Sequence, residues 1–263
     1  MSSSHSQISI VIPQRGINDE GKGKKYALYR LISSSTSEYI WMQDDDVILP
    51  QLLDETEVMR ILQESQADLL ILPLRMHSKH TSPSLLERLQ IAEYAAIQQL
   101  TIDSARRGQA VMCSGANLLV RRDRWLESYG DLHPEIPSGD DMFLLESFKR
   151  RGLKIAVCDD SRFEAVVSPL TSWRDFLKQR MRWAGKAAKY TDKDILQCGS
   201  LVLFTNILQI FFPMILLVKF PVEYRLIKKR DPSVSFITAL LLEVLYPFYI
   251  LLSLIGGFFR RKW

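Results

Sequence analysis

Two long apolar runs at the C-terminal end of the chain limit its possible folds more than any other feature. They cover residues 200–220 and 234–259, and each contains one charged residue, Lys219 and Glu243 respectively. A membrane-crossing helix needs about 20 mostly apolar residues, each of which adds about 1.5 Å of length. We therefore expect two transmembrane helices, because buried helices of a soluble core are usually shorter and keep a polar face.

The basic residues of the chain lie mainly around these apolar runs. Residues 200–263 hold eight Lys and Arg and three acids, a net charge of +5, whereas the whole chain carries +4. Residues 1–199 therefore carry −1, which argues against a nucleic-acid-binding surface on that part. Basic residues beside apolar runs are typical of segments that lie against lipid headgroups.

The same basic residues give a weak indication of orientation. A two-helix hairpin returns the chain to its starting side, where six Lys and Arg would lie, against four in the connecting loop. This difference favours a multi-pass protein with a cytoplasmic catalytic domain and C-terminus, as in a bacterial inner membrane. A shallow hairpin that stays within one leaflet would place all ten at one surface, and this interpretation stays open.

Residues 1–195 alternate short apolar runs with segments of helical spacing. The apolar runs predict strands at 8–13, 38–42, 68–74, 114–121 and 154–158. The helical spacing predicts helices at 26–33, 54–65, 84–102, 142–151 and 170–189. This alternation predicts an α/β catalytic domain over residues 1–195 with a parallel or mixed sheet. Ligands of such sheets lie at the carboxyl ends of the strands.

Three consecutive acids follow the second predicted strand. If the strand continued, its alternation would send Asp44 and Asp46 to one side and Asp45 to the other. Carboxylate oxygens on one side suit a hard divalent cation such as Mg²⁺ or Mn²⁺, which also binds substrate phosphate oxygens. A solvated loop with helix-capping acids is the alternative interpretation.

A second acidic pair, Asp140 and Asp141, stands after Ser138 and Gly139 at the start of a predicted helix. The helix dipole favours acids at this end, so capping accounts for one of them. A carboxylate beside an acceptor hydroxyl can also take its proton as a general base. Capping and catalysis are equally compatible with this motif alone.

Two basic motifs complete the set of candidates. Gln179, Arg182 and Trp183 fall on one face of a predicted helix; arginine suits bidentate phosphate contact, and tryptophan offers a flat face to a sugar or base. A solvated basic helix on lipid headgroups is the alternative. The turn at residues 21–25 is rich in Gly and Lys, and its backbone N–H groups could approach an anion at the following helix N-terminus.

In this order the motifs resemble those of the family 2 glycosyltransferases, especially the membrane-attached members of the cellulose and hyaluronan synthase-like grouping. The motifs are the Gly-Lys turn, the acid triplet, residues 115–117, the Gly139-Asp140-Asp141 turn and residues 179–183. The resemblance covers residues 8–189. It implies a GT-A nucleotide-diphosphosugar transferase-like fold, in which helices flank a mixed sheet, and an inverting transfer.

The resemblance also implies roles for the acidic residues. Asp44 and Asp46 match the Asp-x-Asp motif, which would place Asp44 near the ribose or the metal and Asp46 on the Mg²⁺ or Mn²⁺ that bridges the diphosphate. Asp141 would act as the general base. Asp140 belongs to the same catalytic pair and stands where the family has Glu.

The other motifs are assigned to the donor and the acceptor by the same resemblance. Residues 115–117 would line the acceptor side. The residues expected to bind the nucleotide or its diphosphate are Lys22, Lys24, Gln179, Arg182 and Trp183. The expected partners are a nucleotide-diphosphosugar donor, a lipid-linked or glycan acceptor and the membrane, without nucleic acid.

One departure from the family pattern concerns the N-terminal end. The family opens with a strand, a helix and a second strand before the Gly-Lys turn, whereas this turn begins at Gly21. We therefore expect a domain that lacks the first βα segment. Two alternatives to an active transferase remain: a catalytically impaired membrane scaffold or partner subunit that keeps the fold, and a metal-dependent phosphohydrolase or nuclease that uses the same acids.

Overall fold

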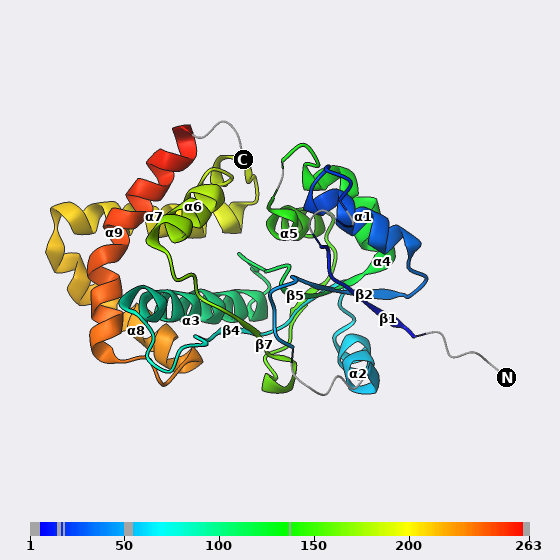
Figure 1. The fold of residues 1–263 in the computed structure, drawn as a ribbon, viewed down its shortest axis with the longest axis horizontal. Helices are drawn as coiled ribbons and strands as arrows, with labels where there is room; N and C mark the ends of the chain where they lie inside the picture. The colour runs from blue at the N-terminus through cyan, green and yellow to red at the C-terminus, as the bar shows by residue number, and fades with distance from the viewer. Residues whose placement is uncertain (1–5, 15–16, 18, 50–54, 137, 260–263) are drawn as a thin grey trace. The chain divides into compact units, whose positions relative to one another are not determined.

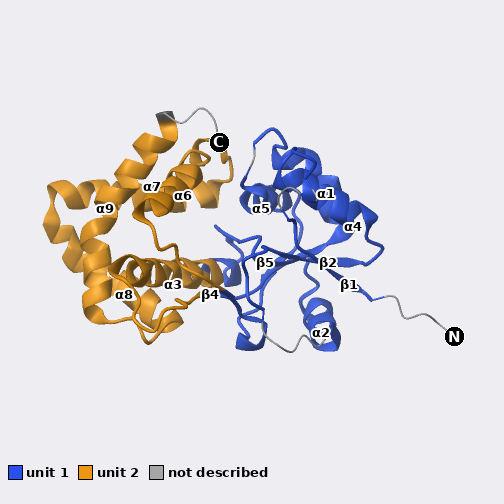
Figure 2. Cartoon of the chain, in the orientation of Figure 1, with its two compact units in different colours: residues 1–74, 104–166 blue, residues 75–103, 167–263 orange. Residues whose placement is uncertain are grey.

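The structure, a computed structural model, describes residues 6–14, 17, 19–49, 55–136 and 138–259. The chain divides into two compact units (Figure 2). The first unit comprises residues 1–74 and 104–166, and the second comprises residues 75–103 and 167–263. The chain passes between the units at three points. Two of them lie in a short two-stranded sheet formed by β4 (Leu74–Met76) and β7 (Ala165–Val167), and the third lies near the end of helix α3 (Leu85–Arg106).

A five-stranded mixed sheet forms the centre of the first unit. The strands lie in the order β1-β2-β5-β3-β6. Strand β1 is parallel to β2 and β3 is parallel to β6, while β5 runs antiparallel to both β2 and β3. The strands are β1 (Ile8–Val11), β2 (Tyr39–Gln43), β3 (Leu69–Ile71), β5 (Asn117–Arg121) and β6 (Ile155–Val157).

Helices cover both faces of this sheet. Figure 1 shows α1, α4 and α5 on one side and α2 on the other. Their bounds are α1 (Lys24–Ser34), α2 (Glu55–Ser65), α4 (Arg122–Ser128) and α5 (Asp140–Arg150). The α2 face shows why the helix packs there: Val58 and Leu62, four positions apart, lie against Trp41 of β2 in one buried cluster.

The predicted strands and helices of this unit are confirmed, with one split. The run at 68–74 forms two strands, β3 and β4, because Pro73 has no N–H group to donate to a ladder. The Pro73 carbonyl instead accepts hydrogen bonds from the Ala165 N–H at 3.1 Å and the Asn117 side chain at 2.9 Å.

Asn117, at the start of β5, joins three segments through its side chain. Its Oδ1 accepts a hydrogen bond from Trp41 Nε1 at 2.8 Å, and its Nδ2 donates to the carbonyls of Pro73 and Phe163 at 2.9 Å each. Asn117 is only 1% exposed. The expectation that its side chain lines an acceptor site is therefore wrong, because the side chain lies inside the core.

Replacing Asn117 with Ala should lower the free energy of unfolding by about 3 kcal/mol, since three buried polar partners lose their hydrogen bonds. Thermal or urea unfolding in detergent measures this loss. Gln109→Ala serves as the control, because Gln109 is exposed and its replacement should change stability by less than about 0.5 kcal/mol. Equal stability of the two variants would contradict the assignment.

The second unit is built from helices. They are α3 (Leu85–Arg106), α6 (Trp173–Ala184), α7 (Lys193–Phe211), α8 (Leu216–Arg230) and α9 (Phe236–Phe259). A buried cluster joins Ala92 and Ala95 of α3 to Ile227 of α8 and Leu242 of α9. Helices α6 and α9 approach closely at Gly257, where a Cβ atom would lie 2.8 Å from the Gly185 nitrogen.

The structure corrects the bounds of the first apolar run. Residues 200–220 do not form one helix: α7 ends at Phe211, and α8 begins at Leu216 after a short turn that contains Pro213. Proline cannot donate the backbone hydrogen bond that would continue α7. Helix α9 matches the second run. Among the described residues, α7 and α9 are long and apolar enough to cross a membrane, judged by length and composition alone.

Candidate functional site

The candidate site of the first unit lies where β2 ends and β5 begins. Gln43, the last residue of β2, pairs with Asn117, the first residue of antiparallel β5. Asp44 and Gly115, which stand just outside this pair, therefore share one edge of the sheet. The N-termini of α1 and α5 bring Lys24, Asp140 and Asp141 to this edge.

Lys24 connects the two acidic motifs. Its Nζ lies 2.7 Å from Asp44 Oδ1 and 3.1 Å from Asp140 Oδ2. The side chain of Asp140 is only 6% exposed, whereas those of Lys24 and Asp44 are 32% and 35% exposed. The ammonium group thus balances a buried carboxylate and a partly open one, which would otherwise repel each other.

These contacts shift the pKa values of both partners. Burial opposes the charge on Lys24, but the carboxylates of Asp140, Asp44 and Asp141 outweigh it and raise the pKa of Lys24 well above its ordinary value. Burial likewise opposes the charge on Asp140, but Lys24 outweighs it and holds the pKa of Asp140 below its usual range. Both groups are therefore charged at neutral pH.

Asp141 is half-buried, like Asp44, and its side chain accepts two backbone hydrogen bonds. Its Oδ1 accepts a hydrogen bond from its neighbour's backbone, Met142 N–H, at 2.8 Å, and its Oδ2 accepts one from Gly115 N–H at 3.4 Å. Gly139, with φ of 85°, turns the chain into α5 so that both acids stand in the first turn. This geometry holds a carboxylate at a helix N-terminus, where the helix dipole favours its ionised form.

Gly115 provides the space that these side chains occupy. A Cβ atom at this position would lie 3.3 Å from Asp140 Oδ2, 3.6 Å from Lys24 Nζ and 3.8 Å from Asp141 Cβ. A larger residue would therefore press on all three groups at once. The sequence placed residues 115–117 near an acceptor, and the structure adds that Gly115 packs against the acids themselves.

The acid triplet has a different shape from the predicted one. Strand β2 stops at Gln43, and residues 44–47 form a turn in which Val47 N–H lies 3.4 Å from the Asp44 carbonyl. The prediction that strand alternation separates Asp45 from Asp44 and Asp46 is therefore wrong. Asp44 is half-buried on Lys24, while Asp45 and Asp46 are exposed in the turn.

No group of three or more His, Cys, Asp or Glu side chains in the described part of the chain is arranged to hold a metal ion. The oxygen donors of Asp44 and Asp46 still suit Mg²⁺ or Mn²⁺, because these ions often use one or two carboxylates together with substrate phosphates. The donor set thus fits a cation that arrives with a diphosphate.

The two lysines of the Gly-Lys turn differ in their surroundings. Lys24 belongs to the acidic cluster, whereas Lys22 pairs with Glu20 at 3.7 Å and lies over the Tyr26 ring at 4.3 Å. Both Lys22 and Glu20 are largely exposed. Both of these partners of Lys22 are close to it in the sequence: Glu20 belongs to the same turn, and Tyr26 lies at the start of α1.

Gln179, Arg182 and Trp183 all lie on α6, in the second unit. Gln179 is half-buried, Arg182 is exposed, and Trp183 is 41% exposed. The Trp183 ring also packs on the guanidinium of Arg180 at 4.2 Å. The helix therefore keeps Arg182 and part of Trp183 open to a ligand.

The sequence analysis missed the residue that anchors this helix, Arg180. It is 6% exposed, and its Nη2 donates to Glu93 Oε2 at 2.5 Å. Tyr249 of α9 donates from its hydroxyl to the other oxygen of Glu93 at 2.5 Å. The available signal was the spacing: Arg180 stands two positions from Arg182 and so lies on a different face of the same helix.

The mixed sheet with an acidic edge defines the first unit as a GT-A glycosyltransferase fold. The chain belongs to the glycosyltransferase-like family 2, whose model matches residues 3–186, and it is a glycosyltransferase of that family. The match includes every motif on which the resemblance rests, from residue 21 to residue 183.

Comparison with solved structures agrees with this fold. The chain is similar to the mannosyltransferase PcManGT from Pyrobaculum calidifontis in complex with GDP-Man and Mn²⁺, with 15% identity, a TM-score of 0.51 and coverage of 91% of this chain and 68% of the other. S. aureus TarS (residues 1–349) in complex with UDP-GlcNAc shows 12% identity, a TM-score of 0.38 and coverage of 90% and 70%. The comparison with curated proteins finds no match.

Replacing Lys24 with Met should lower the free energy of unfolding at pH 7 by about 2 kcal/mol, because Asp140 loses its cation while still buried. The pKa of Asp140 is lowered in the native fold. Its ion pair with Lys24 therefore stabilises the fold fully at any pH above the unfolded pKa of about 3.9, and this stabilisation is lost only as the pH falls below that value. In the variant, the unpaired carboxyl should have a raised pKa and bind a proton as the pH falls. The difference between native and variant melting temperatures should therefore narrow from pH 7 to pH 5.

Lys22→Met is the matched control for this experiment. Its ion pair is largely exposed, so its loss should matter little at either pH. A Lys24→Met variant as stable as Lys22→Met, or one whose deficit does not change with pH, would contradict the role given to Lys24.

Proposed function

We propose that this chain transfers a sugar, with inversion, from a nucleotide-diphosphosugar to a hydroxyl acceptor at a membrane surface. The observation that carries the proposal is the edge of the sheet where Lys24 balances Asp44 and Asp140 beside the half-open carboxylate of Asp141. Family membership supplies the reaction class, and the geometry supports the assignment of roles.

Asp141 is the proposed general base. It would take the proton of the acceptor hydroxyl while that oxygen attacks the anomeric carbon of the donor sugar. A single displacement of this kind inverts the configuration and needs no covalent intermediate on the protein. The two N–H groups that donate to its oxygens, from Gly115 and Met142, would hold the carboxylate in place before the acceptor arrives.

Asp140 is proposed to act through Lys24. The sequence placed it beside Asp141 in catalysis, but its buried side chain is engaged in the ion pair with the ammonium group. By holding Lys24 at the edge of the sheet, it would keep a positive charge near Asp44 and hence near the diphosphate of a bound donor. This makes Asp140 a positioning residue in the proposal.

Asp44 and Asp46 are the proposed holders of a divalent cation with the donor diphosphate. A bound Mg²⁺ or Mn²⁺ would offset the negative charge that develops on the leaving nucleoside diphosphate. The exposed position of Asp46 leaves its oxygens accessible to such an ion. PcManGT, the neighbour with the TM-score of 0.51, is described in complex with GDP-Man and Mn²⁺.

Gln179, Arg182 and Trp183 of α6 are proposed to bind the donor as well. The exposed guanidinium of Arg182 can form paired hydrogen bonds to phosphate oxygens, which a lysine cannot reproduce. Arg182→Lys should accordingly weaken donor binding. We propose a lipid-linked or glycan acceptor, because the second unit carries two helices apolar enough for a membrane.

Two substitutions should separate the proposed roles of the acids. Asp141→Asn should lower kcat by about 10²- to 10⁴-fold and leave donor affinity nearly unchanged, since only the base is lost. Asp46→Asn should weaken Mn²⁺-dependent nucleotide binding by at least about tenfold. Calorimetric titration with GDP-Man and UDP-GlcNAc in the presence of Mn²⁺ measures binding, and product formation measures turnover.

Asp45→Asn is the matched control, because Asp45 is an exposed acid in the same turn. It should bind nucleotide as the native chain does. Full turnover by Asp141→Asn would remove Asp141 as the base. No binding of either donor at millimolar concentration would instead support a partner subunit that keeps the fold without catalysis, and net hydrolysis without transfer would support a phosphohydrolase.

A further inference from the structure

Helices α7 and α8 are joined by the short turn at Pro213, and side-chain hydrogen bonds connect them close to this turn. Lys219, near the start of α8, reaches back to Asn206 Oδ1 at 2.9 Å and Gln209 Oε1 at 3.3 Å, near the end of α7. These contacts show that the chain folds back on itself at the turn, so that the end of α7 and the start of α8 lie close together. The turn is therefore the tip of a folded hairpin rather than a bend within one long helix.

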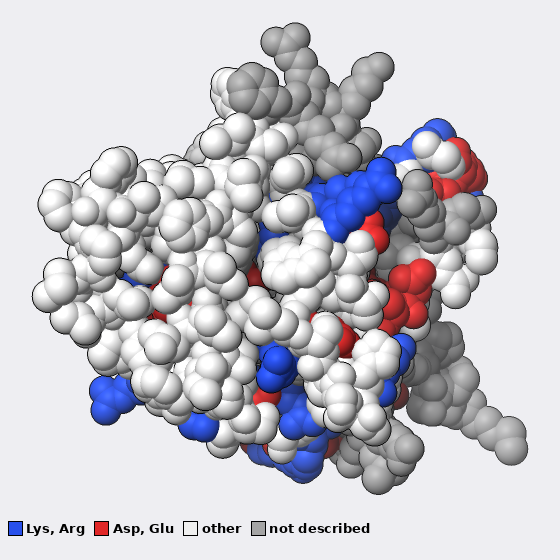
Figure 3. Space-filling view, turned by 60° about the vertical axis from the view of Figure 1, so that its left-hand side comes forward, with Lys and Arg blue, Asp and Glu red and all other residues white. Residues whose placement is uncertain are grey.

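In this hairpin the polar side chains are buried and the large apolar side chains are exposed, the reverse of a protein surface in water. The polar groups face inward: Asn206 is 0% exposed, the Lys219 side chain 8%, and Glu243 of α9, which pairs with Lys219 at 2.8 Å, 0%. The large apolar side chains at the tip are 61% to 75% exposed; they are Phe211, Phe212, Met214, Leu217 and Val218. Figure 3 shows a broad surface with few charged side chains on the side that is turned forward.

This reversal is the opposite of what water imposes on a protein surface. A soluble monomer rarely keeps so many large apolar groups together and open. In hydrocarbon, by contrast, polar groups must find partners inside the protein, as Asn206, Gln209, Lys219 and Glu243 do here. The inward amide of Gln209 also donates to the backbone carbonyl of Glu243 at 2.9 Å. This distribution of side chains is the one expected of a hairpin whose tip is surrounded by lipid.

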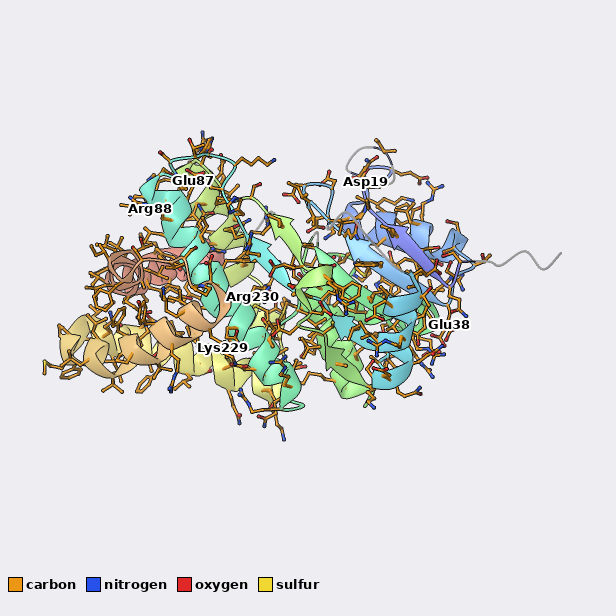
Figure 4. The ribbon with its side chains drawn as sticks, turned by 90° about the horizontal axis from the view of Figure 1, so that it is seen from below. Asp19, Glu38, Glu87, Arg88, Lys229 and Arg230 are labelled. Atoms are coloured by element: carbon orange, nitrogen blue, oxygen red, sulfur yellow. The ribbon has the colours of Figure 1, made fainter. Side chains whose placement is uncertain are left out.

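The length of α8 limits how deep the tip can reach. The apolar arm from Leu216 to Val222 rises only about 10 Å at 1.5 Å per residue, against a hydrocarbon core of about 30 Å. Arg225, on the next turn, is exposed, and Lys229 follows near the end of the helix, where it pairs with Asp103 of α3 (Figure 4). These cations suit anionic headgroups and would be costly deeper in the bilayer.

From these observations we infer that the α7–α8 hairpin enters a single leaflet of a membrane, tip first, and returns to the surface where it entered. The occupant of its exposed apolar tip is the hydrocarbon of that leaflet, and Arg225, which is exposed on α8 beyond the apolar tip, lies at the headgroups. Helix α7 then does not cross the membrane, although its length and composition would allow it. This inference does not depend on the proposed sugar transfer.

Cysteine labelling of the full chain in sealed membrane vesicles tests this topology. The parent carries Cys158→Ser and Cys198→Ser and keeps the buried Cys113. Single reporters are added before α7 (Lys189→Cys), at the tip (Met214→Cys) and after α8 (Ser233→Cys), and a membrane-impermeant maleimide is applied from each side. Each variant must first show the native thermal transition, and Phe212→Cys replaces Met214→Cys if the latter does not fold.

The inferred hairpin predicts that the reporters at 189 and 233 react from the same side and that the tip reporter loses its reaction from both sides. Labelling of 189 and 233 from opposite sides would overturn it, because α7 would then cross. A tip that reacts as fast as the reporter at 189 would also overturn it. So would a protein that does not float with the vesicles, since another copy or a partner would then cover the tip. The readout needs no activity, so an inactive protein leaves the test intact.

Discussion

The ammonium group of Lys24, set between Asp44 and Asp140, is the interaction on which the arrangement of the candidate site depends. It ties the N-terminus of α1 to the end of β2 and to the start of α5. Three acids gathered at one edge of a sheet would otherwise repel one another, and one of them is buried. Lys24 makes their proximity possible, and it leaves Asp141 half-open beside them with two backbone hydrogen bonds of its own.

The charges around Lys24 are those that a family 2 glycosyltransferase would need at a donor site. A sugar-nucleotide donor carries two phosphates and meets a cation, so its site must hold acids for the cation and bases for the phosphates. The first unit of the chain offers both within one short stretch of sheet edge. In the proposed site, a cation held by Asp44 and Asp46 would share with Lys24 the task of balancing the charge of Asp44.

Much of the fold could be predicted from the sequence, because buried strands are apolar and α2 and α5 show clear periodicity. The positions of the acids at strand and helix ends also followed from those elements. What the sequence could not supply was backbone conformation. Strand β2 ends at Gln43 and a turn follows at residues 44–47, so the alternation of side chains along a strand does not extend to the three acids. Lys22 and Lys24 are two positions apart in the sequence, and only the folded structure shows that Lys24 is the one that pairs with Asp44 and Asp140.

Contacts between residues far apart in the sequence could not be predicted either. Asn117 belongs to a motif that suggests a ligand, yet its amide fits three partners far away in the sequence, Trp41, Pro73 and Phe163. Pro213 lies inside a run whose composition alone indicates one helix, and its missing N–H divides that run. In the second unit, Arg180 joins the motif helix α6 to Glu93 and thereby to Tyr249 of the apolar helix α9. Helices α6 and α9 thus share one buried contact.

The most direct measurement of the central claim is the position of Mn²⁺ in crystals of the protein with a nucleoside diphosphate, located by anomalous scattering. We expect one Mn²⁺ ion about 2.1 Å from a carboxylate oxygen of Asp46, with diphosphate oxygens completing its coordination and Lys24 still beside Asp140. An ion bound with the diphosphate but away from both Asp44 and Asp46 would contradict the proposed roles of these acids.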